Sequence, residues 1–229
     1  MNNEIHEVQG SILRELLFHN GTNFASLNKL GLPNDHFVFH IKRLEKEGIV
    51  EKKDKLYFLT QKGKQLAGKI DIYTNKIEKF GTPGVIVTVK KLIQGKTHYL
   101  VQQRLKEPFY GYYGFINGKV RFGERTENTA KRELQEETGL IGEPKLIFIN
   151  HKINGSSEDQ IKLDNFFFVY ITEETTGELV DTIEGKHSWK TMDEIKKLRT
   201  FPGFETVVDA IEKESPLQYL EQFVELENI

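Results

Sequence analysis

The spacing of apolar residues predicts a helical N-terminal region. Aliphatic residues recur every three or four positions and predict an amphipathic helix over residues 4–19. A second short helix is expected around Leu27. The turn-forming residues 31–33 then precede a third helix, which has Asn34 as its N-cap and ends near Gly48. Helix, short turn and helix in this order are typical of the helix-turn-helix arrangement.

A hairpin and a long helix are predicted next. Residues 49–51 and 55–59 flank a polar turn and have the pattern of a β-hairpin. Residues 61–80 are helical in pattern, with apolar positions that alternate spacings of four and three at Leu66, Ile70, Tyr73, Ile77 and Phe80. This seam fits either a short coiled coil that makes a homodimer or a connector helix packed on the first helix. Residues 81–84 (GTPG) break the helix, which predicts two domains, 1–80 and 81–229.

Strand and helix patterns alternate in the second region. Strands are predicted over residues 85–91, 97–104, 145–151 and 164–172. The run FFFVY in the last of these is typical of a strand buried on both faces. Helices are predicted over residues 127–138, 204–213 and 216–226. The fold class is therefore α/β.

Composition narrows the class of protein. With no cysteine, the chain cannot use disulfides, zinc-thiolate sites or thiol nucleophiles. No apolar run approaches the ~18 residues of a membrane span, and the first ten residues lack a signal-peptide pattern. We therefore expect a cytoplasmic protein with no membrane partner. Residues 1–80 contain 13 basic and 10 acidic residues, whereas the remainder contains 19 basic and 24 acidic residues, which weakly favours nucleic acid as a partner of the first region.

Three glutamates mark the candidate chemistry. Glu133, Glu136 and Glu137 lie three or four positions apart, so a helix places them on one face at roughly 5–6 Å between Cβ atoms. They repel one another, and they stand at the negative end of the helix dipole. A divalent cation resolves both conflicts. Oxygen ligands without His or Cys suit Mg²⁺, with Mn²⁺ as an alternative.

The stretch from residue 118 to residue 140 resembles the Nudix box, G-x5-E-x7-R-E-U-x-E-E-x-G-U with U aliphatic. Every fixed position is filled, by Gly118, Glu124, Arg132, Glu133, Leu134, Glu136, Glu137, Gly139 and Leu140. A solvated helix face would explain the charges, but not the glycines and Glu124 at their spacings. The resemblance implies a Nudix hydrolase domain over about residues 82–213, an α/β/α sandwich with a mixed sheet. It also implies that the three glutamates ligate the metal, that the Gly118 carbonyl assists, and that Arg132 with Glu124 holds the glutamates in place.

The family resemblance implies Mg²⁺-dependent hydrolysis of a nucleoside diphosphate linked to another moiety, of the ADP-ribose or nucleoside diphosphate sugar type. Arg104 is a candidate contact to a phosphate. In the aromatic loop before the box, Tyr110 and Tyr112 are candidates to stack on a base, with the core as their alternative place. Glu158 or Asp159, in a polar loop, is a candidate general base or extra metal ligand.

The region of about residues 5–72 resembles the winged helix-turn-helix domain of bacterial and archaeal regulators. The sequence segments FHIKRLEKEGIVEK and YFLTQKGKQLAGK carry this resemblance. The resemblance implies duplex DNA as a partner. Asn34, His36, His40 and Arg43 are then candidates to reach base edges. Lys52, Lys53 and Lys55 are candidates to meet phosphates. The alternative is a domain that serves only packing or assembly.

Two functions from different classes therefore remain. One is an enzyme, with or without DNA binding. The other is a transcription regulator whose Nudix domain senses a nucleotide-like ligand, for which a decayed box is expected. The box of this chain is intact, which favours the enzyme.

Overall fold

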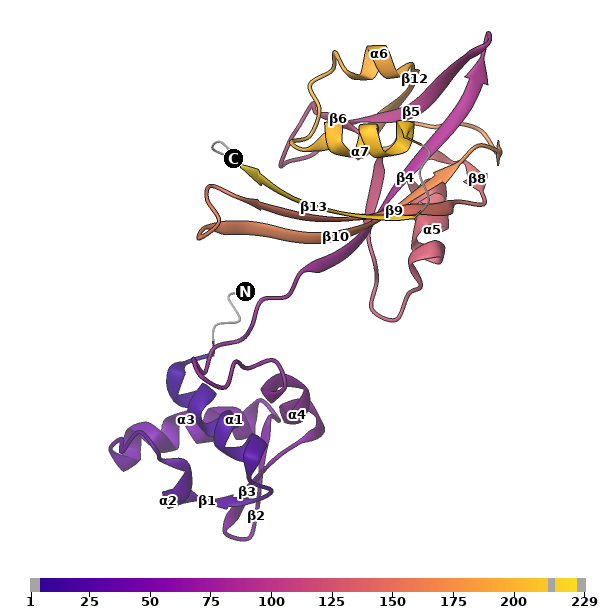
Figure 1. Ribbon diagram of the computed structural model, residues 1–229. Coiled ribbons are helices and arrows are strands. Elements are labelled where there is room, and N and C mark those ends of the chain that lie inside the picture. The colour runs from indigo at the N-terminus through magenta and orange to yellow at the C-terminus, as the bar shows by residue number, and fades with distance from the viewer. Residues whose placement is uncertain (1–4, 214–216, 226–229) are drawn as a thin grey trace. The chain divides into compact units, whose positions relative to one another are not determined.

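The computed structural model describes residues 5–213 and 217–225. The chain divides into two compact units, Met1–Lys79 and Phe80–Ile229 (Figure 1). Residue 4 of the helix predicted over 4–19, and residues 216 and 226 of the helix predicted over 216–226, lie outside the described residues. No helix in the described part of the chain is long and apolar enough to cross a membrane.

The Met1–Lys79 unit combines helices with a small antiparallel sheet. Its helices are α1 (Glu7–Phe18), α2 (Phe24–Leu27), α3 (Asn34–Lys46) and α4 (Gln61–Ala67). Its strands are β1 (Thr22–Asn23), β2 (Val50–Lys53) and β3 (Leu56–Leu59), in the order β1-β3-β2. The apolar side chains Ile12, Leu13, Phe37 and Ile41, each at most 1% exposed, lie in the core between α1 and α3. The three helices and the hairpin predicted for residues 4–59 are therefore present.

α3 begins one residue earlier than predicted. Pro33 is its N-cap, without a side-chain capping hydrogen bond, and Asn34 is its first helical residue. The preceding loop is instead closed by the Asn28 side chain, which accepts from Leu32 N–H at 2.9 Å and donates to Leu32 O at 2.7 Å.

The helix predicted over residues 61–80 is wrong beyond Ala67, where α4 ends. Asp71 Oδ1 accepts hydrogen bonds from two following backbone N–H groups, at 2.9 and 2.6 Å, and this turn competes with the helix. Ile70 then pairs with Ile77 in an antiparallel bridge and is buried in the core of the unit. Tyr73 is 87% exposed. The helical seam predicted for a homodimer is therefore absent.

The Phe80–Ile229 unit is built on one large mixed sheet. The strand order is β12-β5-β4-β10-β9-β13, with β6 paired to β5 and β7 to β4. β10 runs parallel to β4 and β13 runs parallel to β9, whereas the other pairs are antiparallel. The strands of this sheet are β4 (Thr82–Ile93), β5 (Lys96–Arg104), β6 (Tyr113–Gly114), β7 (Ile116–Lys119), β9 (Lys145–Gly155), β10 (Ile161–Thr172), β12 (Gly185–Lys190) and β13 (Gln218–Glu225). β8 (Ile141–Gly142) and β11 (Thr175–Thr176) form a separate pair.

Helices cover both faces of this sheet. α5 (Thr126–Thr138) lies on one face, and α6 (Met192–Ile195) and α7 (Phe204–Glu212) lie on the other (Figure 1). Side chains alternate between the faces, so Leu100 joins the core under α5, whereas its neighbours Tyr99 and Val101 join the core under α7. The α/β class and the sandwich with a mixed sheet are thereby confirmed.

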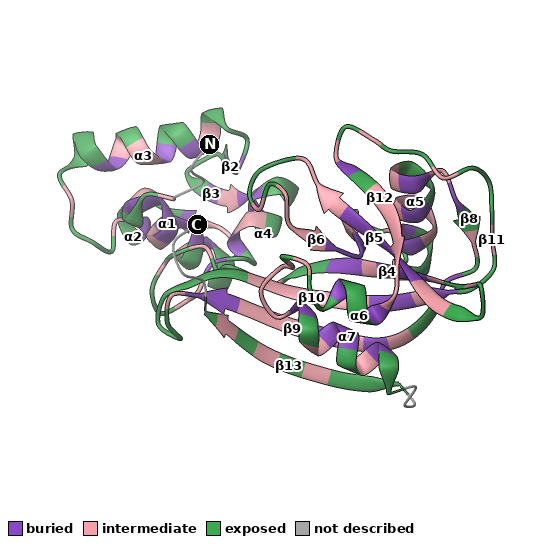
Figure 2. Cartoon of the chain, turned by 90° about the horizontal axis from the view of Figure 1, so that it is seen from above, coloured by how far each residue is buried: buried purple, intermediate pink, exposed green. Residues whose placement is uncertain are grey.

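The segment predicted as a helix over residues 216–226 contains a strand instead. β13 pairs with β9 along its whole length, and exposed and half-buried positions alternate along most of it (Figure 2). Leu220 packs into the core under α7, and Gln222, on the same face, contacts Thr206 of α7. Pairing with the edge of the sheet thus overrides a spacing that also fits a helix.

The FFFVY run is less buried than predicted. Phe166, Phe167 and Phe168 are half-buried, and only Val169 and Tyr170 are fully buried. Phe167 borders a cavity, and Phe166 stacks on His151 with ring centroids 3.9 Å apart.

Candidate active site

The site lies where α5 meets β7, at one end of a cavity of about 660 Å³. α5 ends at Thr138, and Gly139 follows with a left-handed φ of 74°, as the sequence predicted. Gly118 lies on β7 beside this helix. A Cβ atom at Gly118 would stand 1.9 Å from the Glu133 carboxyl carbon, so only glycine lets that carboxylate lie against the strand.

Arg132 organises the acidic groups around it. Its Nε and Nη2 donate to the two Glu124 oxygens at 2.8 and 2.9 Å, and Nη1 donates to Glu133 at 2.6 Å and to Glu136 at 3.1 Å. The hydrogen bonds from Arg132 lower the pKa of Glu124 to about 2. Glu136 is also 3.6 Å from Arg121. The structure thus brings together four charged side chains of the box pattern. They are the guanidinium of Arg132 and the carboxylates of Glu124, Glu133 and Glu136.

Glu137 has a different environment. Gln102 Nε2 of β5 donates to Glu137 Oε2 at 2.7 Å. Burial, and to a smaller extent the nearby Glu133, raises the pKa of Glu137 to about 7, although Gln102 opposes this shift. Gln102 Nε2 also lies 3.2 Å from His187 Nε2. Sequence reasoning missed Gln102. In the sequence it is a polar residue directly after the apolar positions of β5, and the structure shows that it is buried.

The glutamates fit a divalent cation chemically but are not gathered around one point. Among the described residues, no three His, Cys, Asp or Glu side chains are close enough to hold a metal ion. The reason is that Arg132 draws Glu133 and Glu136 to itself, while Gln102 holds Glu137. The donor set consists of oxygen atoms only, and the Glu137 carboxylate is desolvated without forming an ion pair with any described residue. Such groups suit Mg²⁺ or Mn²⁺.

Arg104 lines the cavity and shapes the loop beside it. Its guanidinium donates to three carbonyls of that loop, at Lys106 (2.9 Å), Glu107 (3.4 Å) and Pro108 (2.7 Å). Phe109, next in the chain, lines the cavity with a left-handed φ of 71°, which is uncommon for an aromatic residue.

The aromatic residues of the cavity differ from those expected. Phe109 and Phe115 are part of the lining, whereas Tyr110 and Tyr112 are not. Tyr110 is 58% exposed. Tyr112 packs under Arg199, whose guanidinium carbon lies 4.1 Å from the ring centroid. A pattern of aromatic residues in a loop does not reveal which side chains turn inward.

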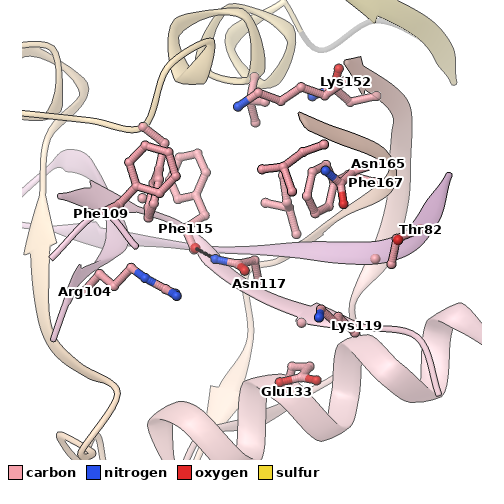
Figure 3. A pocket seen from close by; sticks show the side chains of 18 of the residues that line it. Thr82, Arg104, Phe109, Phe115, Asn117, Lys119, Glu133, Lys152, Asn165 and Phe167 are labelled. Carbon is pink, nitrogen blue, oxygen red and sulfur yellow. Dashed lines mark hydrogen bonds between the residues drawn. The ribbon is translucent and has the colours of Figure 1, made fainter. Parts of the chain in front are cut away.

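The other end of the cavity is polar. Figure 3 shows Lys152 of β9 and Glu133 of α5 on opposite sides of Asn117 and Phe115. Asn165 and Phe167 of β10 border the same end. Glu158 and Asp159, the candidate general bases, are exposed in the loop between β9 and β10 and do not line the cavity.

The candidate DNA contacts belong to the other unit. On α3, Asn34, His36 and Arg43 are exposed, and Arg43 Nε donates to Glu47 at 2.9 Å. His40 is half-buried, with its ring centroid 4.3 Å from that of His6. The three lysines of the hairpin, Lys52, Lys53 and Lys55, are exposed.

Comparison with known proteins agrees with this geometry. The sequence model of the NUDIX domain matches residues 82–210. An uncharacterized Nudix hydrolase of Bacillus subtilis, YvcI, is 28% identical over 116 residues, which cover 48% of this chain and 70% of the relative. A solved MutT protein from Bacillus halodurans aligns with a TM-score of 0.54 at 26% identity, over 62% of this chain and 89% of the other.

A second solved structure shares the fold. The NUDIX domain of Shewanella oneidensis NrtR, in complex with ADP ribose, aligns with a TM-score of 0.52 at 14% identity, over 68% of this chain and 98% of that domain. The family model covers more than half of the chain, and Glu133, Arg132 and Gly118 lie together as described. The chain therefore belongs to the Nudix hydrolase family, whose members act on pyrophosphate bonds and generally use divalent metal ions.

Proposed function

We propose that this chain uses Mg²⁺, for which Mn²⁺ can substitute, to hydrolyse a nucleoside diphosphate linked to a second moiety, of the ADP-ribose or nucleoside diphosphate sugar type. One observation carries this proposal: Glu133, Glu136 and Glu137 line one end of a cavity of about 660 Å³ whose other end is aromatic and polar. A diphosphate at the glutamates leaves space in the same cavity for a further group.

The roles of the side chains follow from their positions. A bound divalent cation would neutralise diphosphate charge and ease the formation of hydroxide from water. Glu133, Glu136 and Glu137 supply oxygen ligands, and Arg132 fixes the first two of them. Arg104 and Arg121, which also line the cavity, offer positive charge to the phosphate oxygens.

A panel of diphosphate substrates tests this function. Purified protein is incubated with ADP-ribose, with nucleoside diphosphate sugars and with nucleoside triphosphates, and the released nucleoside monophosphate is measured with and without Mg²⁺. We expect turnover of at least one diphosphate-linked compound, and loss of that turnover in EDTA. Tight nucleotide binding without turnover in Mg²⁺ or Mn²⁺ would instead support the alternative, a regulator that senses a ligand.

We also propose that the Met1–Lys79 unit is a winged helix-turn-helix domain that binds duplex DNA. This is supported by its exposed lysines on the β2–β3 hairpin together with exposed Asn34, His36 and Arg43 along one helix. The hairpin would contact phosphates and α3 would enter the major groove. His40 would contribute less to the contact with DNA, because its ring is half-buried against His6.

A further inference from the structure

The polar end of the cavity is built across neighbouring strands. Residues 150, 152 and 154 alternate along β9, so Asn150, Lys152 and Asn154 share the face that borders the cavity. Lys152 is paired in register with Asn165 of β10 on one side and with Gln222 of β13 on the other. Asn150, Asn154, Asn165 and Gln222, all with amide side chains, therefore share this face with Lys152.

The Lys152 ammonium has little that neutralises it. Its Nζ donates to the Pro202 carbonyl, and it forms no ion pair with any carboxylate of the described residues. Burial lowers the pKa of Lys152 to about 8, against the influence of Glu205, which raises it. An ammonium has three N–H donors, so donors remain for a ligand.

Asn150 adds a second unmet donor. Its side chain is completely buried, and Gln222 Nε2 donates to its Oδ1 at 3.1 Å. Thr206 Oγ1 lies 3.0 Å from Gln222 Oε1 and fixes the orientation of that amide. The Nδ2 of Asn150 is therefore left as a donor, and no described group accepts from it. A buried donor without an acceptor destabilises the protein, and an acceptor on a ligand would relieve this cost.

The walls of the same region are flat and apolar. Phe109 and Phe115 stand on one side of the cavity in Figure 3, and Phe167 stands on the other, below Lys152. Phe204 of α7 is also part of the lining. Aromatic faces with hydrogen-bond donors at one edge suit a planar ring that carries acceptors at its rim.

We propose that this end of the cavity is a nucleobase subsite in which Lys152 and Asn150 select a 6-oxopurine over adenine. The inference rests on the proposed function, because it names the nucleoside of that substrate, and within that class it favours nucleoside diphosphate sugars with a 6-oxopurine over ADP-ribose. The 6-oxo group and N7 of such a purine are adjacent acceptors, and Lys commonly donates to this pair. Adenine instead presents a 6-amino donor, which would oppose the ammonium and the amide N–H and leave them unpaired.

Binding of two nearly identical nucleotides tests the subsite apart from catalysis. Inosine and adenosine monophosphate differ in the purine ring only by the 6-oxo or 6-amino group and the matching proton on N1. Their affinities for the full chain are measured by titration calorimetry in EDTA, for wild type, Lys152→Met and Lys145→Met. Lys145 is an exposed lysine on the same strand and serves as the control.

We expect wild type to bind the inosine nucleotide roughly 10-fold to 100-fold more tightly, since a hydrogen bond to a charged donor commonly contributes that much. Lys152→Met should lose most of this ratio, and Lys145→Met should keep it. Equal affinities in wild type, or no detectable binding of either nucleotide at millimolar concentration, would overturn the subsite without requiring any variant to fold. An unchanged ratio in a folded Lys152→Met protein would do the same. Failure of hydrolysis alone would remove the proposed function and leave this binding contrast in place.

Discussion

Arg132 and Glu124 are joined by two parallel hydrogen bonds, from Nε and Nη2 of the guanidinium to the two carboxylate oxygens at 2.8 and 2.9 Å. Both side chains are 16% exposed, so water competes weakly for the pair. The remaining guanidinium nitrogen, Nη1, is thereby turned toward Glu133 and Glu136. The loop before α5 and the acidic face of α5 are thus held by one planar group.

Arg132→Lys should lower activity although it keeps the charge. An ammonium cannot reproduce the fork that meets Glu124 while also fixing Glu133 and Glu136. We expect kcat to fall roughly 10-fold to 100-fold through misplacement of the glutamates, and stability to fall by about 1–2 kcal/mol. Steady-state kinetics and urea unfolding measure the two effects. Arg125→Lys, at an exposed position one residue before the helix, should change neither.

Glu137→Gln tests the proposed role of the glutamates as metal ligands. The substitution keeps size and helical propensity but removes one negative charge, so metal affinity and transition-state stabilisation should both fall. We expect a loss of about 10²-fold or more in rate, and a similar loss for Glu136→Gln. Glu127→Gln lies at the other end of α5, where the carboxylate is 58% exposed, and should be nearly silent. Equal rates for wild type and Glu137→Gln, or activity that persists in EDTA, would contradict the assignment.

His151 should make stability depend on pH. Its ring nitrogens lie 2.8 Å from Glu221 and 2.9 Å from Asp164. Burial opposes the charged ring, but the hydrogen bonds to Glu221 and Asp164 prevail and raise the pKa of His151 above its ordinary value of 6.5. Because the folded-state pKa is the higher one, the contribution to stability is complete below pH 6.5 and is lost as pH rises through the folded-state value.

Urea unfolding of wild type and His151→Gln at several pH values measures this contribution. The difference in unfolding free energy between the two proteins should be largest at mildly acid pH and should shrink at alkaline pH. Hydrogen exchange of β13 amides should rise in the variant, because Glu221 ties that strand to β9. A difference that grows with pH would reverse the sign of the pKa shift and contradict the argument.

Replacing Lys52, Lys53 and Lys55 together by Gln should weaken DNA binding. Each phosphate contact that is lost should reduce the slope of log affinity against log salt by about 0.9. Fluorescence anisotropy with a random duplex at several salt concentrations measures the slope. Replacing Lys162, Lys186 and Lys197, three exposed lysines of the other unit, removes the same charge and should leave the slope unchanged. A wild-type protein without salt-dependent binding at low ionic strength would rule out the DNA proposal.

The acidic end of the site could be predicted because its parts are close in sequence. Glu133, Glu136 and Glu137 share a helical face by spacing alone, and Gly139 ends that helix at the predicted position. The mixed α/β sheet followed from the resemblance that this short stretch carries. The strands around it could be predicted from the alternation of apolar and polar positions and from the turn residues between the strands.

The polar end could not be predicted because its parts meet only through sheet pairing. Lys152 and Gln222 lie far apart in the chain and become neighbours when β13 adds to β9. The spacing of residues 216–226 suits a helix equally well, and only the vacant sheet edge decides between the two. The error at residues 68–80 has a different cause, because there a local turn at Asp71 ends a seam that is regular by spacing.

The position of β13 separates the acidic end of the cavity from its polar end. The acidic groups belong to α5 and the loop before it, whereas the amide that orients Asn150 arrives on the last strand of the sheet. Replacing Gln222 should therefore change the orientation of Asn150, which lines the cavity, while the acidic groups keep their geometry. A chain arranged in this way can change the polar end of the cavity through its last strand, and it need not rebuild the acidic groups on α5.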